Sequence, residues 1–252
     1  MSWPARLRAR AGQSDGLRST PVLTLASLRW IVRNRAWTAW YLVRYWRFLR
    51  FRMANPHVIT EGLVFLGRRV EIEVRPGYGR LILGRWVHIG DGTSLRCHEG
   101  TMRIGDKTVF GRNIVVNGYL DISIGAACII ADMVYLTDFD HVFSDVERPI
   151  KDQGITKAPV RIGDDVWLGT KATVVRGTAV GRGSVVAAHA VVTQDLPPFS
   201  VAAGVPARVL RNRQDEQATV RQTQAALADM AAKLRAASPN RPPPPDQPPP
   251  AS

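Results

Sequence analysis

Residues 160–192 read VRIGDDVWLGTKATVVRGTAVGRGSVVAAHAVV, and an aliphatic residue returns at every sixth position. These anchors are Ile162, Leu168, Val174, Val180, Val186 and Val192. A small residue follows several of them, as Gly163 and Gly169 do. A period of six fits neither the 3.6-residue turn of a helix nor the alternation of a single strand. It is typical of a solenoid of short strands, in which each strand buries one aliphatic side chain and stacked coils share a core.

The same period continues upstream with two interruptions. Anchors begin at Leu83, slip around residues 97–100, and are regular again from Ile124. The period then fails over residues 137–159, which we interpret as a loop thrown out from one coil. The charged or titratable residues of this loop include Asp138, Asp140, His141, Asp145, Glu147 and Arg148. Long loops in compact domains are usually functional or disordered, and this composition favours function.

The composition limits the classes of partner and compartment. The 252 residues carry a formal charge of +13, and 45% of them are hydrophobic. Such a basic balance favours an anionic partner. The two cysteines, Cys97 and Cys128, form no metal or disulfide pattern and are expected to be buried thiols in a reducing compartment. We expect no signal peptide and no membrane-spanning helix, because arginines interrupt the first apolar run.

The segment over residues 20–56 is basic and aromatic, without an acidic residue between Asp15 and Glu61. It predicts an amphipathic helix, or two helices joined near Asn34. On one continuous helix the following arginines would lie within about a third of the helical wheel: Arg29, Arg33, Arg44, Arg47 and Arg50. In one interpretation the segment covers the open end of the solenoid. In the other, residues 20–55 bind an anionic membrane surface. A nucleic-acid partner is not expected, since an aromatic surface suits burial better than groove contact.

Three later segments carry a family resemblance: IGDDVWLG at 162–169, VVTQDLPP at 191–198 and VAAGVPAR at 201–208. With the DFDH segment that ends at His141, they resemble the hexapeptide-repeat acyltransferases, and most of all the galactoside, maltose and colanic-acid O-acetyltransferases. The resemblance covers residues 124–211. It implies a mainly β fold, a left-handed parallel β-helix, which is an exception to the usual right-handed crossover. It also implies a homotrimer with each site between adjacent subunits.

The activity that the resemblance implies is transfer of an acetyl or short acyl group from acetyl-coenzyme A to a saccharide hydroxyl. His141 matches the general base of the family, and an imidazole can take the proton from an attacking hydroxyl. The next residue is often proline in the family and is Val142 here. Asp138, Asp140 or a carboxylate elsewhere is expected to orient the ring.

The resemblance also implies residues that contact the two substrates. Asn113 aligns with an acceptor-site asparagine, Arg148 serves the acceptor or braces the loop, and Trp167 shapes the acceptor groove from the outer wall. Asp138 and Asp140 are placed at the acceptor as well. The coenzyme A channel is implied for Gly169, Thr170, Ala188, Thr193, Gln194, Arg208 and Arg211. Its arginines would pair with phosphates. Gln194 replaces a lysine that is common in the family.

Other functions remain open at this stage. They are N-acyl transfer to an amino sugar and a non-catalytic, membrane-associated scaffold. A carbonic anhydrase of the same fold would need three zinc-binding histidines with one close pair, and the five histidines here form no such pair, so no metal is expected. The expected location is the cytoplasm, with the inner membrane face added if the second interpretation of residues 20–55 holds.

The expected organisation has five segments. A mobile N-terminus (1–19) precedes the helical segment (20–56) and the β-helix acyltransferase domain (57–212). A C-terminal helix (213–237) and a disordered proline-rich tail (238–252) follow.

Overall fold

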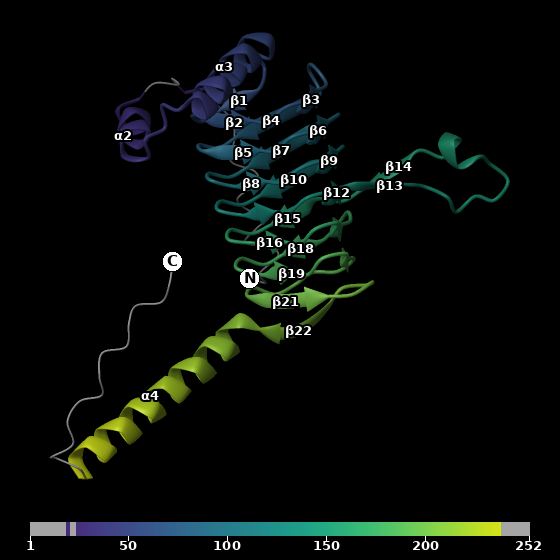
Figure 1. Ribbon diagram of the computed structural model, residues 1–252. Coiled ribbons are helices and arrows are strands. Elements are labelled where there is room, and N and C mark those ends of the chain that lie inside the picture. Colours follow the sequence, from purple (N-terminus) through teal and green to yellow (C-terminus); the bar gives the residue numbers. More distant parts are fainter. Residues whose placement is uncertain (1–18, 21–23, 238–252) are drawn as a thin grey trace. The chain divides into compact units, whose positions relative to one another are not determined.

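The computed structural model describes residues 19–20 and 24–237, in which the chain is mainly a β-solenoid (Figure 1). Its coils wind through three parallel sheets, here called A, B and C. Sheet A contains β1 (Ile59–Thr60), β4 (Gly79–Leu83), β7 (Gly100–Ile104), β10 (Asp121–Ile124), β15 (Val160–Ile162) and β18 (Ala179–Val180). Sheet C contains β3 (Glu71–Val74), β6 (Ser94–Cys97), β9 (Val115–Gly118), β12 (Tyr135–Thr137), β17 (Thr173–Val174) and β20 (Val191–Val192).

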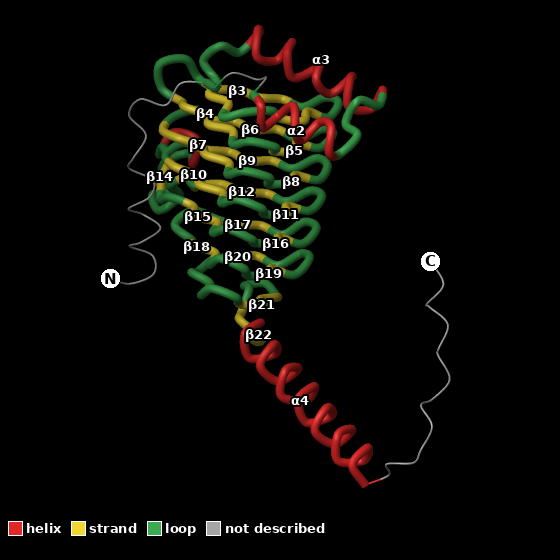
Figure 2. The backbone as a smooth tube through the Cα atoms, turned by 90° about the vertical axis from the view of Figure 1, so that its left-hand side faces the viewer, coloured by secondary structure: helices red, strands yellow, loops and turns green. Residues whose placement is uncertain are grey.

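Sheet B is longer because an antiparallel strand ends it. It contains β2 (Val64–Leu66), β5 (Val87–Ile89), β8 (Val109–Phe110), β11 (Ile129–Ile130), β16 (Trp167–Leu168), β19 (Val185–Val186), β21 (Ser200–Ala203) and β22 (Arg208–Asn212). Each coil passes from sheet A to B to C, so the solenoid has three edges. We call them the A–B, B–C and C–A corners. Figure 2 shows the strands stacked coil upon coil.

The register confirms the six-residue period. Ile162 on β15 pairs with Ile124 and Val180, so one sheet presents a ladder of aliphatic side chains to the core. The next anchor, Leu168, pairs with Ile130 in sheet B. The anchors are almost wholly buried. Because successive anchors fall on successive sheets, the period of six is the length of one side of the coil.

The glycines that follow the anchors are required by the closeness of the coils. A Cβ added to Gly163 would lie 2.6 Å from the backbone nitrogen of Arg182 in the next coil. The closest atoms that such a Cβ would meet belong to the backbone of Arg182, so no flexible side chain could move to make room for it. Cys128 and Cys97 are buried, free thiols, as expected. Burial raises the pKa of Cys128 to about 11.

In the part of the N-terminal segment that the structure describes, two helices precede the solenoid, α2 (Leu25–Arg33) and α3 (Ala39–Ala54). Thr24 caps α2 by accepting the backbone N–H of Ser27 at 3.1 Å. The helix ends at Asn34, where the sequence placed the joint, and the arginine stripe of a continuous helix is therefore divided between two helices. Phe48 of α3 is buried in the solenoid core.

The helices cover the first coil of the solenoid, one of the two roles left open by the sequence (Figure 1). Trp30 of α2 stacks on Trp86 with ring centroids 4.5 Å apart and also contacts Phe65 at 5.6 Å. These contacts cover the apolar end of sheet B. Such a cover protects strand edges that would otherwise pair with another chain.

Helix α4 (Arg213–Ala237) belongs to a second unit, which begins at Arg213. The expectations for residues 1–18 and for the proline-rich tail at 238–252 lie outside the described residues. Within the described ranges, no helix is both long and apolar enough to cross a membrane.

Candidate active site

The loop expected over residues 137–159 contains a β-hairpin that leaves the C–A corner (Figure 1). Its strands are β13 (Phe139–His141) and β14 (Ile155–Lys157), and a short 3-10 helix, η1 (Ile150–Asp152), lies in its tip. His141 pairs with Ile155 on the stem and is exposed. The candidate base therefore stands outside the solenoid, on a regular element rather than on a free loop.

Asp138 fastens the base of the hairpin to the preceding coil. Its side chain is wholly buried. Its two carboxylate oxygens accept the backbone N–H groups of Tyr119, Leu120 and Asp121 at 2.7, 2.8 and 2.7 Å. Three N–H donors satisfy a buried carboxylate well. Asp138 is thus an anchor of the corner, and its carboxylate binds the backbone of the preceding coil.

Asp140 fastens the stem in the other direction along the solenoid. Its Oδ2 accepts a hydrogen bond from Nε of Arg176 at 2.6 Å. Arg176 follows β17 at the C–A corner of the next coil. The two aspartates considered as ring-orienting groups therefore hold the hairpin between two coils.

Arg148 braces the tip of the hairpin. Its guanidinium donates to the carbonyl of Asp152, and its own carbonyl accepts Nε2 of Gln153 at 2.8 Å. Gln153 also exchanges hydrogen bonds with Asp145, at 2.7 and 3.0 Å. Of the two roles considered for Arg148, these contacts correspond to the bracing of the loop.

Aromatic rings connect the solenoid wall to His141. His98 stacks on Tyr119 with centroids 4.5 Å apart, and Tyr119 meets Phe139 edge to face at 4.6 Å. Phe139 in turn contacts His141 at 6.2 Å. The ammonium of Lys157 lies 5.5 Å above the Tyr119 ring and pairs with Glu99. We call His98, Tyr119, Phe139 and His141 the aromatic ladder.

The sequence analysis missed all of this ladder except His141. A usable signal exists, because His98, Tyr119 and Phe139 are spaced by 21 and 20 residues. That spacing is one full coil in this part of the solenoid, as the pairing of Arg96 with Asn117 on adjacent strands shows. Residues one coil apart at a corner lie above one another.

Asn117 is a second residue that sequence reasoning did not single out. It lies on β9 and pairs with Thr137, directly before the hairpin. Its buried Oδ1 has no hydrogen-bond partner among the residues that the structure describes. A buried polar atom without a partner is uncommon and marks a place for a ligand or a water molecule.

Asn113, the asparagine selected from the sequence, lies elsewhere. Asn113 has a left-handed backbone conformation, with φ of 54°, and lies at the B–C corner just before β9 of sheet C. The hairpin leaves sheet C at its other end, which is the C–A corner. Within one chain Asn113 and His141 are therefore at different corners.

Trp167 lies on β16 in sheet B, paired with Ile129 and Val185. Half of its surface is exposed (50%), in agreement with a position on the outer wall. In a three-sided solenoid, sheet B is the side opposite the C–A corner. One chain therefore keeps Trp167 and His141 on opposite sides.

The residues expected to contact coenzyme A also fall into separate groups. Gly169 and Thr170 lie at the B–C corner, and the N–H of His189 donates to the Thr170 carbonyl at 2.9 Å, so Ala188 lies beside them in the next coil. Thr193 and Gln194 follow β20 at the C–A corner and are exposed. Arg208 and Arg211 are exposed on β22.

A small pocket lies at the C–A corner beside Thr193 and Gln194. It has a volume of 170 Å³ and is lined by Ala158, Pro159, Arg161, Gly177, Thr178, Ala179 and Asp195. Arg161 is nearly buried and pairs with Asp121. Burial raises the pKa of Asp121, and the charge of Arg161 opposes that rise. In the described part of the chain, no group of three or more histidine, cysteine or acidic side chains is arranged to hold a metal ion.

The chain matches one family model and aligns with a relative over most of its own length. The family model described as the hexapeptide repeat of succinyl-transferase matches residues 159–194. A probable acetyltransferase of Mycobacterium tuberculosis is 55% identical over 211 residues, which are 84% of this chain and 70% of the relative. An Escherichia coli protein assigned as a lipopolysaccharide-biosynthesis O-acetyl transferase is 35% identical over 120 residues, 42% of this chain and 61% of that protein.

A solved structure supports the fold alone. The N-acyltransferase AntD from Bacillus cereus, in complex with dTDP and 3-hydroxybutyryl-CoA, superposes with a TM-score of 0.57. The alignment covers 72% of this chain and 96% of that protein at 19% identity. At this identity the likeness concerns the solenoid and not the substrate.

Proposed function

We propose a donor, an acceptor and a base for this chain, which belongs to the hexapeptide-repeat acetyltransferase family. It transfers an acetyl or short acyl group from acetyl-coenzyme A to a saccharide hydroxyl, and His141 is the general base. The observation that carries this proposal is the placement of an exposed histidine on a doubly anchored hairpin, at the end of the aromatic ladder.

The chemistry follows from the weakness of a neutral alcohol as a nucleophile. As the hydroxyl oxygen attacks the thioester carbonyl, its proton must leave. The neutral imidazole of His141 takes that proton, and coenzyme A departs as the thiolate or thiol. Asp138 and Asp140 contribute by position, because they hold the hairpin at both sides of its base. They are positioning residues in this proposal.

We propose that the active unit is a homotrimer of left-handed β-helices, with each site between adjacent subunits. The separation of the candidate residues supports this assembly. One subunit would supply the C–A corner with His141, Thr193 and Gln194. Its neighbour would supply Trp167 with the B–C corner, where Thr170 and Ala188 lie. A cyclic trimer repeats the same contact three times and closes on itself.

The donor would lie along this boundary. Small residues at the B–C corner, Gly169 and Ala188 among them, leave room for an extended pantetheine chain. Arg208 and Arg211 are exposed on β22, where guanidinium groups would pair with phosphates. Gln194 provides an amide where a lysine is common, so the positive charge at the phosphate end rests on the arginines.

The acceptor would lie against the aromatic ladder. The ladder supplies aromatic edges, and the buried Oδ1 of Asn117, which has no partner among the described residues, would accept a hydroxyl of a sugar that enters this corner. A saccharide has apolar C–H faces and many hydroxyls, which match such a mixture of rings and amides. An amino sugar would present an amine in place of the hydroxyl, and this alternative is decided by the product.

The location we propose is the cytoplasm, which is reducing and keeps buried thiols such as Cys97 and Cys128 unpaired. An anionic membrane surface is the additional partner suggested by residues 20–55.

The experiment is mass spectrometry of the products formed from acetyl-coenzyme A and a panel of neutral and amino sugars. The proposal predicts a mono-acetylated neutral sugar whose acetyl group is lost in mild alkali, since esters are cleaved under conditions that amides survive. His141→Ala should lower turnover by a factor of roughly 10²–10⁴, the usual contribution of a positioned base. His141→Asn should do no better, because an amide does not accept the proton.

The control is Lys107→Ala, since Lys107 is exposed at the A–B corner, which the proposed site does not use. It should turn over at the wild-type rate. An alkali-stable product would establish N-acyl transfer instead. Near-native turnover by His141→Ala, with coenzyme A binding unchanged in calorimetry, would remove His141 as the base.

A further inference from the structure

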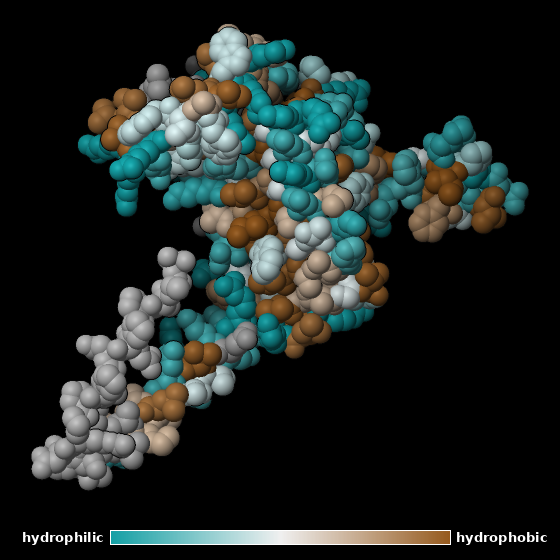
Figure 3. All heavy atoms as spheres, in the orientation of Figure 1, coloured by the Kyte–Doolittle hydropathy of each residue, from teal (hydrophilic) through white to brown (hydrophobic). Residues whose placement is uncertain are grey.

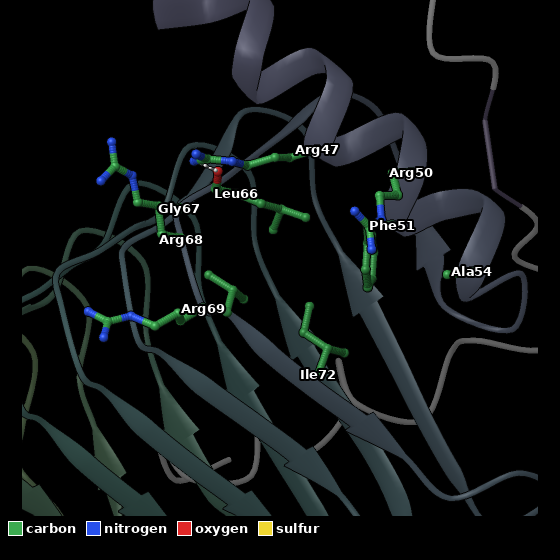
Figure 4. Close-up of a pocket in the computed structure, with 10 residues that line it drawn as sticks. Arg47, Arg50, Phe51, Ala54, Leu66, Gly67, Arg68, Arg69 and Ile72 are labelled. Carbon is green, nitrogen blue, oxygen red and sulfur yellow. Dashed lines mark hydrogen bonds between the residues drawn. The ribbon is translucent and has the colours of Figure 1, made fainter.

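A second cavity lies away from the candidate active site, between α3 and the first coil. Its volume is 490 Å³. Four arginines line it, Arg47 and Arg50 from α3 and Arg68 and Arg69 from the turn between β2 and β3 (Figure 4). The remaining lining residues are Phe51, Ala54, Leu66, Gly67, Val70 and Ile72. Among the described residues, no carboxylate lines this arginine pocket.

The guanidinium groups of the pocket have few internal partners. Arg47 donates to the carbonyl of Leu66 at 3.5 Å, a long hydrogen bond (Figure 4). Of the carboxylates nearby in the sequence, Asp91 lies against the pocket at Gly67 and Arg68, whereas the other two face Arg96. Asp91 accepts the backbone N–H of Arg68 at 2.8 Å, and Glu71 and Glu73 lie 3.9 and 3.7 Å from Arg96.

One carboxylate beside four arginines leaves an excess of positive charge, and this excess favours an external anion. The ends of Arg47, Arg68 and Arg69 extend to the same side of the pocket in Figure 4. Burial, followed by the positive charge of Arg47, lowers the pKa of Arg44 one turn before it. The environment therefore fits a phosphate group, which arginine binds through paired N–H donors.

Beside the pocket, α3 exposes an apolar stripe. Leu42, Trp46, Leu49 and Met53 follow one another at intervals of four, three and four residues, and they are exposed by 56, 63, 48 and 65%. This spacing places all four on one side of the helix. Arg47 and Arg50 each follow a stripe residue by one position, so they flank the stripe. Helix α2 exposes a similar row, Leu25, Leu28 and Val32, at 72, 51 and 66%.

The two observations identify an amphiphilic partner. A contiguous apolar surface of this kind marks a protein or membrane contact. A second copy that met this face with its own α2 and α3 would cover the stripe but would bring no anion to the arginines, because α2 and α3 contain no acidic residue. A layer of anionic lipid meets both demands. Apolar side chains and tryptophan enter the acyl boundary, while arginines remain at the headgroups.

We propose that the outer face of α2 and α3 docks on an anionic phospholipid bilayer, and that the arginine pocket holds a lipid phosphate headgroup. The surface is distinct from the aromatic ladder and does not depend on the acetyl-transfer proposal. Figure 3 shows apolar residues on the outside of the helical segment beside hydrophilic ones. Docking by this end leaves the hairpin, which departs from a later coil, free of the bilayer contact.

The experiment is co-sedimentation of the full chain with vesicles of phosphatidylcholine alone or with phosphatidylglycerol added. Binding should require the anionic lipid and should weaken as salt rises. The double variant Arg68→Gln, Arg69→Gln should bind about 10- to 30-fold more weakly, given the usual contribution of each basic residue near a charged surface. Trp46→Gln should weaken binding at all salt concentrations.

The matched control is Arg221→Gln, Lys233→Gln, which removes two charges from α4 and should bind like the wild type. Circular dichroism checks that each variant is folded. Equal binding by the pocket variant and the control would overturn the pocket. Several other results would overturn lipid docking: equal binding to both kinds of vesicle, retention by duplex DNA without vesicle binding, or a Trp46→Gln effect confined to self-association.

Discussion

At the scale of single residues, the hairpin depends on a buried carboxylate whose hydrogen-bond donors are backbone N–H groups. Asp138 accepts three backbone N–H groups from the preceding coil and is fully buried. Such a residue resembles a catalytic aspartate in the sequence, because it stands three positions before the candidate base. The distinction between an anchor and a ring-orienting group depends on contacts across a coil, which spacing along the chain does not reveal.

The variant Asp138→Ala tests this distinction. It leaves three buried donors without an acceptor, so unfolding free energy should fall by about 3 kcal/mol or more. His141→Ala, at an exposed position, should leave the melting temperature unchanged within a degree or so. Thermal denaturation of the two variants side by side makes the comparison. A melting temperature for Asp138→Ala equal to that of the wild type would show that the carboxylate is not an anchor.

Among the acceptor residues, the sequence led to Asn113 and the structure draws attention to Asn117. Alignment by counting back from Ile124 selected an asparagine at a corner. In the structure, the buried Oδ1 of Asn117 has no hydrogen-bond partner among the described residues, and Asn117 lies beside the base of the hairpin. In the proposed trimer Asn113 joins the B–C corner that the neighbouring subunit contributes. His141 itself was accessible from sequence because it interrupts a regular period.

At the scale of elements, the aliphatic period predicted the solenoid because every anchor buries its side chain in the shared core. Ile162, Leu168 and Val174 are the last residues of three successive strands, one in each sheet of the same coil, and each is buried. The hairpin could not be predicted in the same way. Its strands are held by Arg176 and by the backbone of residues 119–121, and these partners come from coils on both sides.

Val180 tests the ladder that the period describes. It is fully buried on β18, between Ile162 and Leu196. Val180→Asp would place an unpaired carboxylate in the core and should cost several kcal/mol. Val109→Asp is the matched control, because Val109 faces outward on β8 and is 42% exposed. Denaturant unfolding compares the two. A midpoint for Val180→Asp as high as that of the control would contradict the register.

At the scale of the whole molecule, the first coil and the corners have separate tasks. The helical segment covers the end of the core through Phe48 and Trp30, yet leaves apolar side chains and arginines on its outer face. The sequence offered end cover and membrane contact as alternatives. Because the two faces of α3 carry different residues, one helix can perform both tasks.

The trimer is proposed because the candidate residues lie at different corners of one chain. The candidate residues alternate between the C–A corner, sheet B and the B–C corner, and one chain holds them apart. Sequence alone assigned these residues through a family resemblance and left their relative positions open. The three-sided cross-section separates them in one subunit and allows a neighbour to complete each set.

The central claim is that each acetyl-transfer site combines His141 of one subunit with Trp167 of the next. Co-expression of His141→Ala and Trp167→Ala chains with different affinity tags, followed by purification on both tags, yields only mixed oligomers. In every mixed cyclic trimer one site of the three receives both intact residues. We therefore predict about a third of the wild-type turnover from mixed trimers, although each variant alone is strongly impaired. Mixed oligomers no more active than the two separate variants would contradict the shared site.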